Sequence, residues 1–163
     1  MIFTTGRRLL ACVSFALAGA GAWAAELPPA DAKPLSQILE AVEAAHPGVI
    51  ISVEFDERRW EVISCEAGSR LTCTELQIDP RSAKTLRSSR DQNFDTRPPA
   101  GGKTAAQIAR GIEDRKLGTI VEIEFDDPVW ELSLRGNGVR AKLDVDPVSG
   151  EIRSCRGLGC PAR

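Results

Sequence analysis

The stretch VEFDERRWEV, residues 53–62, determines the fold, and residues 123–132 repeat its pattern as IEFDDPVWEL. In both stretches a phenylalanine precedes an acidic turn, and a tryptophan follows at the same spacing. Recurrence at a fixed separation indicates one supersecondary unit that is built twice. We therefore expect an α+β fold of two repeated units, each an N-terminal helix packed on a three- to four-stranded antiparallel meander.

The first unit is expected over residues 34–88. Pro34 begins a helix that runs to about Ala45, because its apolar residues fall at helical spacing. Three strands should follow over about 49–55, 59–65 and 72–79, with a short return strand near 85–87. Alternation in the first strand predicts one buried apolar face, made of Val49, Ile51, Val53 and Phe55.

The second unit is expected over residues 104–155, with Thr104 as the N-cap of its helix. Residues 136–138, Gly-Asn-Gly, predict a tight hairpin turn because they tolerate positive φ. An extended leader over 25–33 precedes the first unit, and residues 89–103, rich in proline and glycine, predict a linker. Residues 156–163 are expected to form a C-terminal tail.

Residues 1–24 have the features of a secretory signal peptide. Arg7 and Arg8 precede an apolar run, and Ala22-Trp23-Ala24 offers the small residues that a signal peptidase requires. A lipoprotein cleavage box at Cys12 is the alternative, but only three residues separate Cys12 from Arg8. We expect cleavage after Ala24, no stable membrane insertion afterwards, and a location in the periplasm or outside the cell.

The charge excludes one class of partner. The chain has 21 Lys and Arg against 23 Asp and Glu, a formal net charge of −2. A mildly acidic chain lacks the basic surface that binds nucleic acid, so we expect no nucleic-acid partner.

Four cysteines remain after the signal peptide: Cys65, Cys73, Cys155 and Cys160. In an oxidising compartment they predict two disulfides, and we favour the local pairing of Cys65 with Cys73 and of Cys155 with Cys160. A bond from the tail to the first pair is the alternative. The spacings do not match those of a zinc site, and the chain has a single histidine.

The ends of the two meanders carry a short motif. Residues 145–152 read VDPVSGEI, and residues 78–85 read IDPRSAKT, with Ala83 in place of the glycine. With the helix and aromatic strand before it, this motif resembles that of the PepSY domain, and the resemblance covers most of residues 34–154 twice. The resemblance implies a small exported protein that restrains a protease or modulates another envelope partner.

Catalytic chemistry has little support in the sequence. The single histidine, His46, lies at the end of the first predicted helix, so a Ser-His-Asp triad has no second candidate. No glycine-rich phosphate loop follows a strand. We expect no enzymatic activity and no cofactor.

Two sets of residues are candidates for binding. The acidic turns could hold a divalent metal, although turn residues are often acidic for solvation alone. Trp60 and Trp130 could anchor a partner, although their alternation with Val62 and Leu132 favours the core. The predicted function is a non-enzymatic exported binding or regulatory protein that modulates an envelope or secreted partner, such as a protease or sensor. Periplasmic metal binding or sensing is the alternative, with ligands Asp56, Glu57, Asp126 and Asp127.

Overall fold

A computed structural model describes residues 26–66, 72–91 and 96–161. The expected signal peptide lies outside these residues. The order of elements is α1 (Leu35–Ala45), β1 (Val49–Asp56), β2 (Arg59–Cys65), β3 (Cys73–Ile78), β4 (Thr85–Asp91), α2 (Ala105–Glu113), β5 (Thr119–Asp126), β6 (Val129–Gly136), β7 (Val139–Val145) and β8 (Ile152–Leu158).

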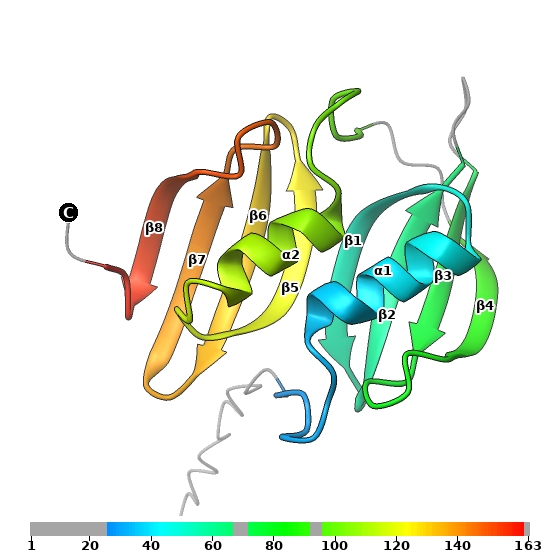
Figure 1. Ribbon diagram of the computed structural model, residues 1–163, viewed down its shortest axis with the longest axis horizontal. Coiled ribbons are helices and arrows are strands. Elements are labelled where there is room, and N and C mark those ends of the chain that lie inside the picture. Colours follow the sequence, from blue (N-terminus) through cyan, green and yellow to red (C-terminus); the bar gives the residue numbers. More distant parts are fainter. Residues whose placement is uncertain (1–25, 67–71, 92–95, 162–163) are drawn as a thin grey trace, which may run out of the picture.

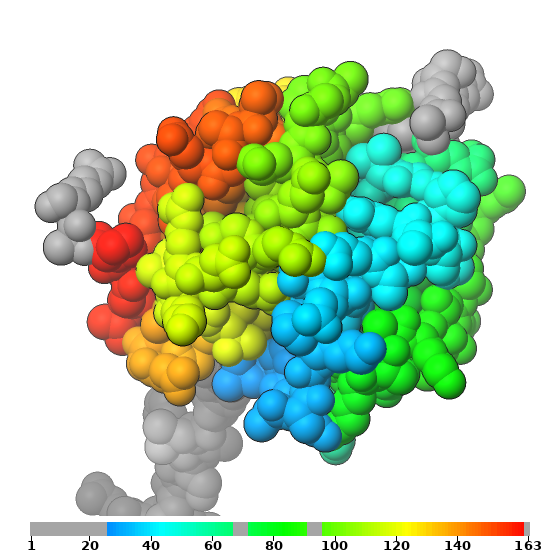
Figure 2. Space-filling view, viewed as in Figure 1, coloured from blue at the N-terminus to red at the C-terminus, as the bar shows by residue number. Residues whose placement is uncertain are grey.

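All eight strands form one antiparallel sheet in the order β4-β3-β2-β1-β5-β6-β7-β8. Both helices lie on the same face of this sheet, side by side (Figures 1 and 2). The expected division into two units is therefore wrong. Strand β1 pairs directly with β5, with Val53 opposite Ile123, and residues from both sides of this pairing share one hydrophobic core. Pairing two apolar strands removes two free edges and buries one large core instead of two small ones.

The alternation of β1 is interrupted by a β-bulge. Ile50 pairs with Ser64 and Ser52 pairs with Ile63, which leaves Ile51 as the extra residue. An extra residue reverses the side-chain direction, so Ile50 joins the main core and Ile51 lies on the opposite face. The prediction that Val49 and Ile51 share the buried face of Val53 and Phe55 was wrong for this reason: Ile51 is buried on the opposite face, and Val49 is exposed. Strand β5 has the same irregularity at Val121.

Both tryptophans lie in the core, as their alternation predicts. Trp60 is 2% exposed and Trp130 is fully buried. Each packs edge-to-face against a phenylalanine of the preceding strand, with ring centroids 5.0 Å apart for Phe55–Trp60 and 5.3 Å apart for Phe125–Trp130. This geometry suits the quadrupoles of the rings and joins the two strands of each hairpin.

Two predicted boundaries were wrong at the edges of the sheet. Strand β4 continues to Asp91, into the expected linker, and β8 continues to Leu158, into the expected tail. Both strands are polar and solvent-exposed, because an edge strand pairs on one side only and buries little of its surface. Hydrophobic alternation therefore does not reveal them.

The helices begin at the positions that the sequence predicts, to within one residue. Thr104 is the N-cap of α2 and forms a capping box with Gln107. The two helices run antiparallel, since Glu113 near the end of α2 accepts hydrogen bonds from the backbone N and Oγ of Ser36 at the start of α1. Arg110 and Glu40 form an ion pair across the middle of the two helices.

Two turns with the same hydrogen bonds end β3 and β7. Asp79 accepts hydrogen bonds from the backbone of Arg81 and Ser82, and Asp146 does the same with Val148 and Ser149. The fifth residue of each turn has positive φ: 62° at Ala83 and 77° at Gly150. Glycine adopts this conformation freely, whereas alanine is strained there.

We predict that Trp130→Ala lowers the free energy of unfolding by about 3–5 kcal/mol, because it leaves a large cavity in the core. Chemical denaturation measures the change. Val148→Ala is the control, since Val148 is 64% exposed and should change stability little. An unchanged denaturation midpoint for Trp130→Ala would contradict the burial of this ring.

We predict that Ala83→Gly raises the free energy of unfolding by roughly 0.5–1 kcal/mol, because it relieves strain at a positive φ. The converse change, Gly150→Ala, should destabilise by about 1–2 kcal/mol, since it introduces the same strain. Thermal denaturation of both variants tests this. Destabilisation by Ala83→Gly would show that the turn is not strained.

Candidate functional site

The face of the sheet opposite α1 and α2 carries a row of carboxylates. We call this face the open face, since neither helix covers it (Figure 1). Side chains alternate between the two faces of a strand, so the residues between the core positions of β2, β1, β5 and β6 point outward here. Five of them are glutamates, and we call this set the acidic strip: Glu61, Glu54, Glu122, Glu124 and Glu131.

The register of the sheet sets these glutamates side by side. Glu54 lies opposite Glu61 on one side and opposite Glu122 on the other. Across the next pair of strands, Glu124 lies opposite Glu131. Like charges directly opposite each other on antiparallel strands are destabilising.

The pKa values of two carboxyl groups at the centre of the strip, those of Glu54 and Glu124, are raised. Partial burial raises the pKa of Glu54, and repulsion from Glu122 and other nearby carboxylates raises it further. The pKa of Glu124 is raised by the same two causes, with a small opposing effect of Lys142. Glu122 accepts a hydrogen bond of 2.6 Å from Ser133 Oγ. Among the described residues, none of these three glutamates forms an ion pair.

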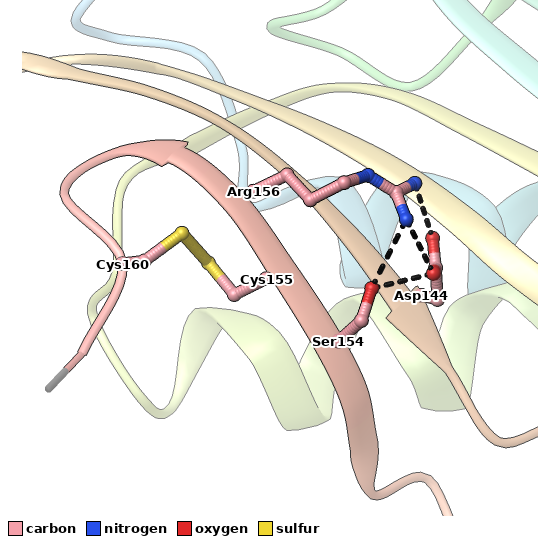
Figure 3. Close-up of a disulfide and its surroundings, with 5 residues drawn as sticks. All are labelled: Asp144, Ser154, Cys155, Arg156 and Cys160. Atoms are coloured by element: carbon pink, nitrogen blue, oxygen red, sulfur yellow. Dashed lines mark hydrogen bonds and ion pairs between the residues drawn. A yellow bond between two sulfur atoms is a disulfide. The ribbon is translucent and has the colours of Figure 1, made fainter. Parts of the chain in front are cut away.

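The carboxylates toward the edges of the sheet are neutralised. On β7, Asp144 accepts hydrogen bonds from Ser154 and Arg156 of the edge strand β8, with both Arg156 contacts at 2.9 Å (Figure 3). The Ser154 hydroxyl and then the Arg156 guanidinium lower the pKa of Asp144. On β2, Arg59 lies 3.3 Å from Glu61. Unneutralised negative charge is therefore concentrated on β1 and β5.

A small apolar cluster adjoins the acidic strip on the open face. It consists of Ile51, Cys65 and Cys73, with Ile63 packed against them. The Cys65–Cys73 disulfide joins directly paired residues of β2 and β3, with Cα atoms 4.0 Å apart. The structure buries both of these cysteines completely.

The second predicted disulfide, Cys155–Cys160, is also present and closes a short ring from Cys155 within β8 to Cys160 beyond its end (Figure 3). The local pairing of the cysteines is thus confirmed. Disulfides are typical of exported proteins, because oxidising compartments preserve them. In the described part of the chain, no helix is long and apolar enough to cross a membrane.

The other predicted binding residues do not form a common site. Trp60 and Trp130 are buried in the core, so neither ring is exposed on the surface as an anchor for a protein partner. Asp56 and Asp126 lie in the first and second acidic turns, each three residues beyond the Val53–Ile123 pair. Because β1 and β5 are antiparallel, these turns are at opposite ends of the sheet, roughly 20 Å apart.

The acidic turns therefore cannot share one metal ion. Each turn contributes two of the predicted ligands: Asp56 with Glu57, and Asp126 with Asp127. Within residues 26–66, 72–91 and 96–161, no group of three or more His, Cys, Asp or Glu side chains is arranged to hold a metal.

The glutamates of the acidic strip are visible in the sequence, but the sequence does not predict that they lie side by side. They occupy the polar positions of the alternating strands, which is the ordinary pattern of a half-exposed strand. The pairing of β1 with β5 brings Glu54 next to Glu122, and no local pattern predicts that pairing. Glutamates at corresponding positions of both stretches, Glu54 with Glu124 and Glu61 with Glu131, were the available signal.

Comparison with known proteins gives little further information. No protein-family model matches the chain, and no curated protein matches it. A crystal structure from Clostridium difficile 630, of a protein provisionally described as a lipoprotein, aligns with a TM-score of 0.45 and 13% sequence identity. The alignment covers 76% of this chain and 91% of that chain. Similarity at this level carries no conclusion about function.

We predict that Glu54→Gln raises the free energy of unfolding at pH 7 by up to about 0.5 kcal/mol, because it removes repulsion at the centre of the strip. The gain should disappear as the pH falls through the raised pKa of Glu54, since protonation then removes the same charge from the unaltered protein. Denaturation at pH 7 and about pH 4 measures both values.

Glu151→Gln is the control for this experiment, because Glu151 is exposed and lies outside the strip. Its effect should be small at both pH values. If Glu54→Gln destabilised the protein at pH 7, the proposed repulsion would be refuted.

Proposed function

We propose that this chain is a non-enzymatic exported binding or regulatory protein that uses its open face to dock a partner with a basic surface. One observation supports this proposal above the others. The open face keeps adjacent, unpaired carboxylates at its centre, although their mutual repulsion opposes folding. Residues that lower stability are often retained for function.

The arrangement of charge suits recognition of a protein. Arg59, Arg156 and Asp144 form ion pairs at the borders of the strip, whereas Glu54, Glu122 and Glu124 are available at its centre. A partner's lysine or arginine side chains would relieve the repulsion on binding. Complementary charge of this kind speeds association and discriminates against wrong partners, and the effect weakens as salt screens it.

The apolar cluster beside the strip adds a second kind of contact. Ile63 is half-buried and accessible at the open face, next to the completely buried disulfide of Cys65 and Cys73. Interfaces combine an apolar centre with polar surroundings. The neighbouring disulfide holds β2 and β3 together, so this part of the surface is organised before a partner arrives.

The partner is an envelope or secreted protein, such as a protease or a sensor, and the compartment is the periplasm or the exterior of the cell. These details rest on the predicted signal peptide and on the resemblance to the PepSY domain, which stays a prediction. Metal binding by the acidic turns has no supporting group among the described residues, so we do not propose it as a second function.

The experiment compares binding by two variants of equal charge. The open-face variant carries Glu54→Gln, Glu122→Gln and Glu124→Gln. The control variant carries Glu66→Gln, Asp114→Asn and Glu151→Gln, which are exposed positions outside the acidic strip. Partners are captured from envelope extract at low salt, identified, and their affinities measured with each purified variant.

We expect the partner to bind the unaltered protein and the control variant equally, and the open-face variant at least about tenfold more weakly. Raising the salt concentration should weaken binding of the unaltered protein more than binding of the open-face variant. Equal binding by both variants would refute the role of the open face. Failure to capture any partner under several conditions would count against the function itself.

A further inference from the structure

A cavity of about 480 Å³ lies at one end of the helix-covered face, and no step of the proposed docking uses it. We call it the leader cavity. Its walls come from four parts of the chain: residues 28–35 before and at the start of α1, Trp60 of β2, the end of α2 with the start of β5, and the turn between β6 and β7. The blue leader, the yellow-green end of α2 and the orange β6–β7 turn meet in Figure 2.

The leader wall is held in place by contacts with the β3–β4 turn. The backbone N of Lys33 donates a 2.9 Å hydrogen bond to the carbonyl of Pro80. Asp31 forms a 2.8 Å ion pair with Arg81. Proline at positions 28 and 29 restricts the backbone further. The cavity is therefore bounded by a fixed segment, and a ligand would not have to order it.

The charged groups around the leader cavity leave a net positive character. Among the described residues of its lining, the single carboxylate is that of Glu113, which already accepts hydrogen bonds from the backbone N and Oγ of Ser36. The two lysines in the lining, Lys33 and Lys116, are exposed and form no ion pair with the described residues. Two unpaired ammonium groups beside a satisfied carboxylate favour an anionic ligand.

The wall also contains a buried polar group without a partner. Trp60 is 2% exposed and lines the cavity, and its indole Nε1 has no hydrogen-bond acceptor in the described part of the chain. Buried donors normally have an acceptor, and a ligand in the cavity could supply one to this N–H. The indole Nε1 of Trp130 also has no acceptor among the described residues, but Trp130 lines neither of the two cavities. Its N–H signal can therefore serve as an internal reference in a binding experiment.

A second cavity of about 390 Å³ serves as a comparison, because it has the corresponding place in the repeated part of the chain but different lining residues. It lies between residues 97–104 and the start of β1, and Lys103 has the place there that Lys33 has in the leader cavity. Its lining also carries two cations, Lys103 and Arg97, but it contains no tryptophan and includes the half-buried carboxyl of Glu43, whose pKa is raised by burial. Of these two cavities, the leader cavity alone combines two lysines with a buried, unpartnered indole N–H.

We propose that the leader cavity binds a small molecule that combines a carboxylate with an apolar body. Lys33 and Lys116 would bind the carboxylate, and an acceptor atom of the ligand would take the hydrogen bond of the Trp60 indole. The apolar body would pack against Pro28, Pro29 and the Trp60 ring. This site is on the opposite side of the sheet from the acidic strip, so the inference is independent of the proposed docking.

Nuclear magnetic resonance of the ¹⁵N-labelled protein, purified after export, tests the proposal. The indole N–H signals of Trp60 and Trp130 are assigned with Trp60→Phe and Trp130→Phe. The probe is N-acetyl-phenylalanine, and the matched neutral control is its amide. We expect the acid to shift the Trp60 signal saturably and to leave Trp130 unchanged, with the amide at least about tenfold weaker.

Lysine variants locate the carboxylate. Lys33→Gln and Lys116→Gln should each weaken binding of the acid several-fold without changing the melting temperature. Lys103→Gln, the equivalent change beside the second cavity, should leave binding unchanged, as should the open-face triple variant. The proposal is overturned if the Trp60 signal does not respond to the acid. It is equally overturned if acid and amide bind alike, or if Lys103→Gln has the same effect as Lys33→Gln.

Discussion

The antiparallel pairing of β1 with β5 is the interaction on which the rest of the structure depends. Val53 and Ile123 face each other at its centre, and both are fully buried beneath the helix layer. The pairing continues β4-β3-β2-β1 into β5-β6-β7-β8 and sets α1 beside α2. Without it, each half would be a domain of marginal size, with an apolar strand at its edge. Contacts between the helices, such as Glu113 with Ser36, then close the core from above.

The same pairing creates the electrostatic character of the open face. A strand register that buries Val53 against Ile123 necessarily sets Glu54 against Glu122, because successive side chains point to opposite faces. Core packing and surface repulsion are therefore consequences of one register. Slippage by one residue would separate these glutamates but would expose the core. The protein keeps the register that packs the core well and places the glutamates unfavourably on the surface. Partial burial raises the pKa of Glu54, and repulsion from Glu122 raises it further.

The sequence predicted the parts of this fold that depend on neighbours along the chain. Helical spacing located α1, Thr104 marked the start of α2, and alternation placed both tryptophans in the core. What it missed depends on neighbours in space. The bulges at Ile51 and Val121 reverse an alternation that looks unbroken in the sequence, and the edge strands β4 and β8 lack an apolar face. The β1–β5 pairing and the acidic strip were missed for the same reason, since either strand could equally have ended a separate sheet.

The polar edges have a consequence for how copies of this protein meet. An open sheet can in principle grow without limit, each copy adding its first strand to the last strand of another. Here the outer strand β4 carries Arg87 and Arg90, so an incoming edge meets positive charge at that end. On β8, Arg153 and Arg156 are already paired with Asp146 and Asp144. The Cys155–Cys160 ring begins within β8 and holds the Cα atoms of the two cysteines 5.7 Å apart, so the chain beyond Leu158 turns back toward this edge strand. These features oppose filament growth at both ends of the sheet, while the open face between the ends stays accessible to a different protein.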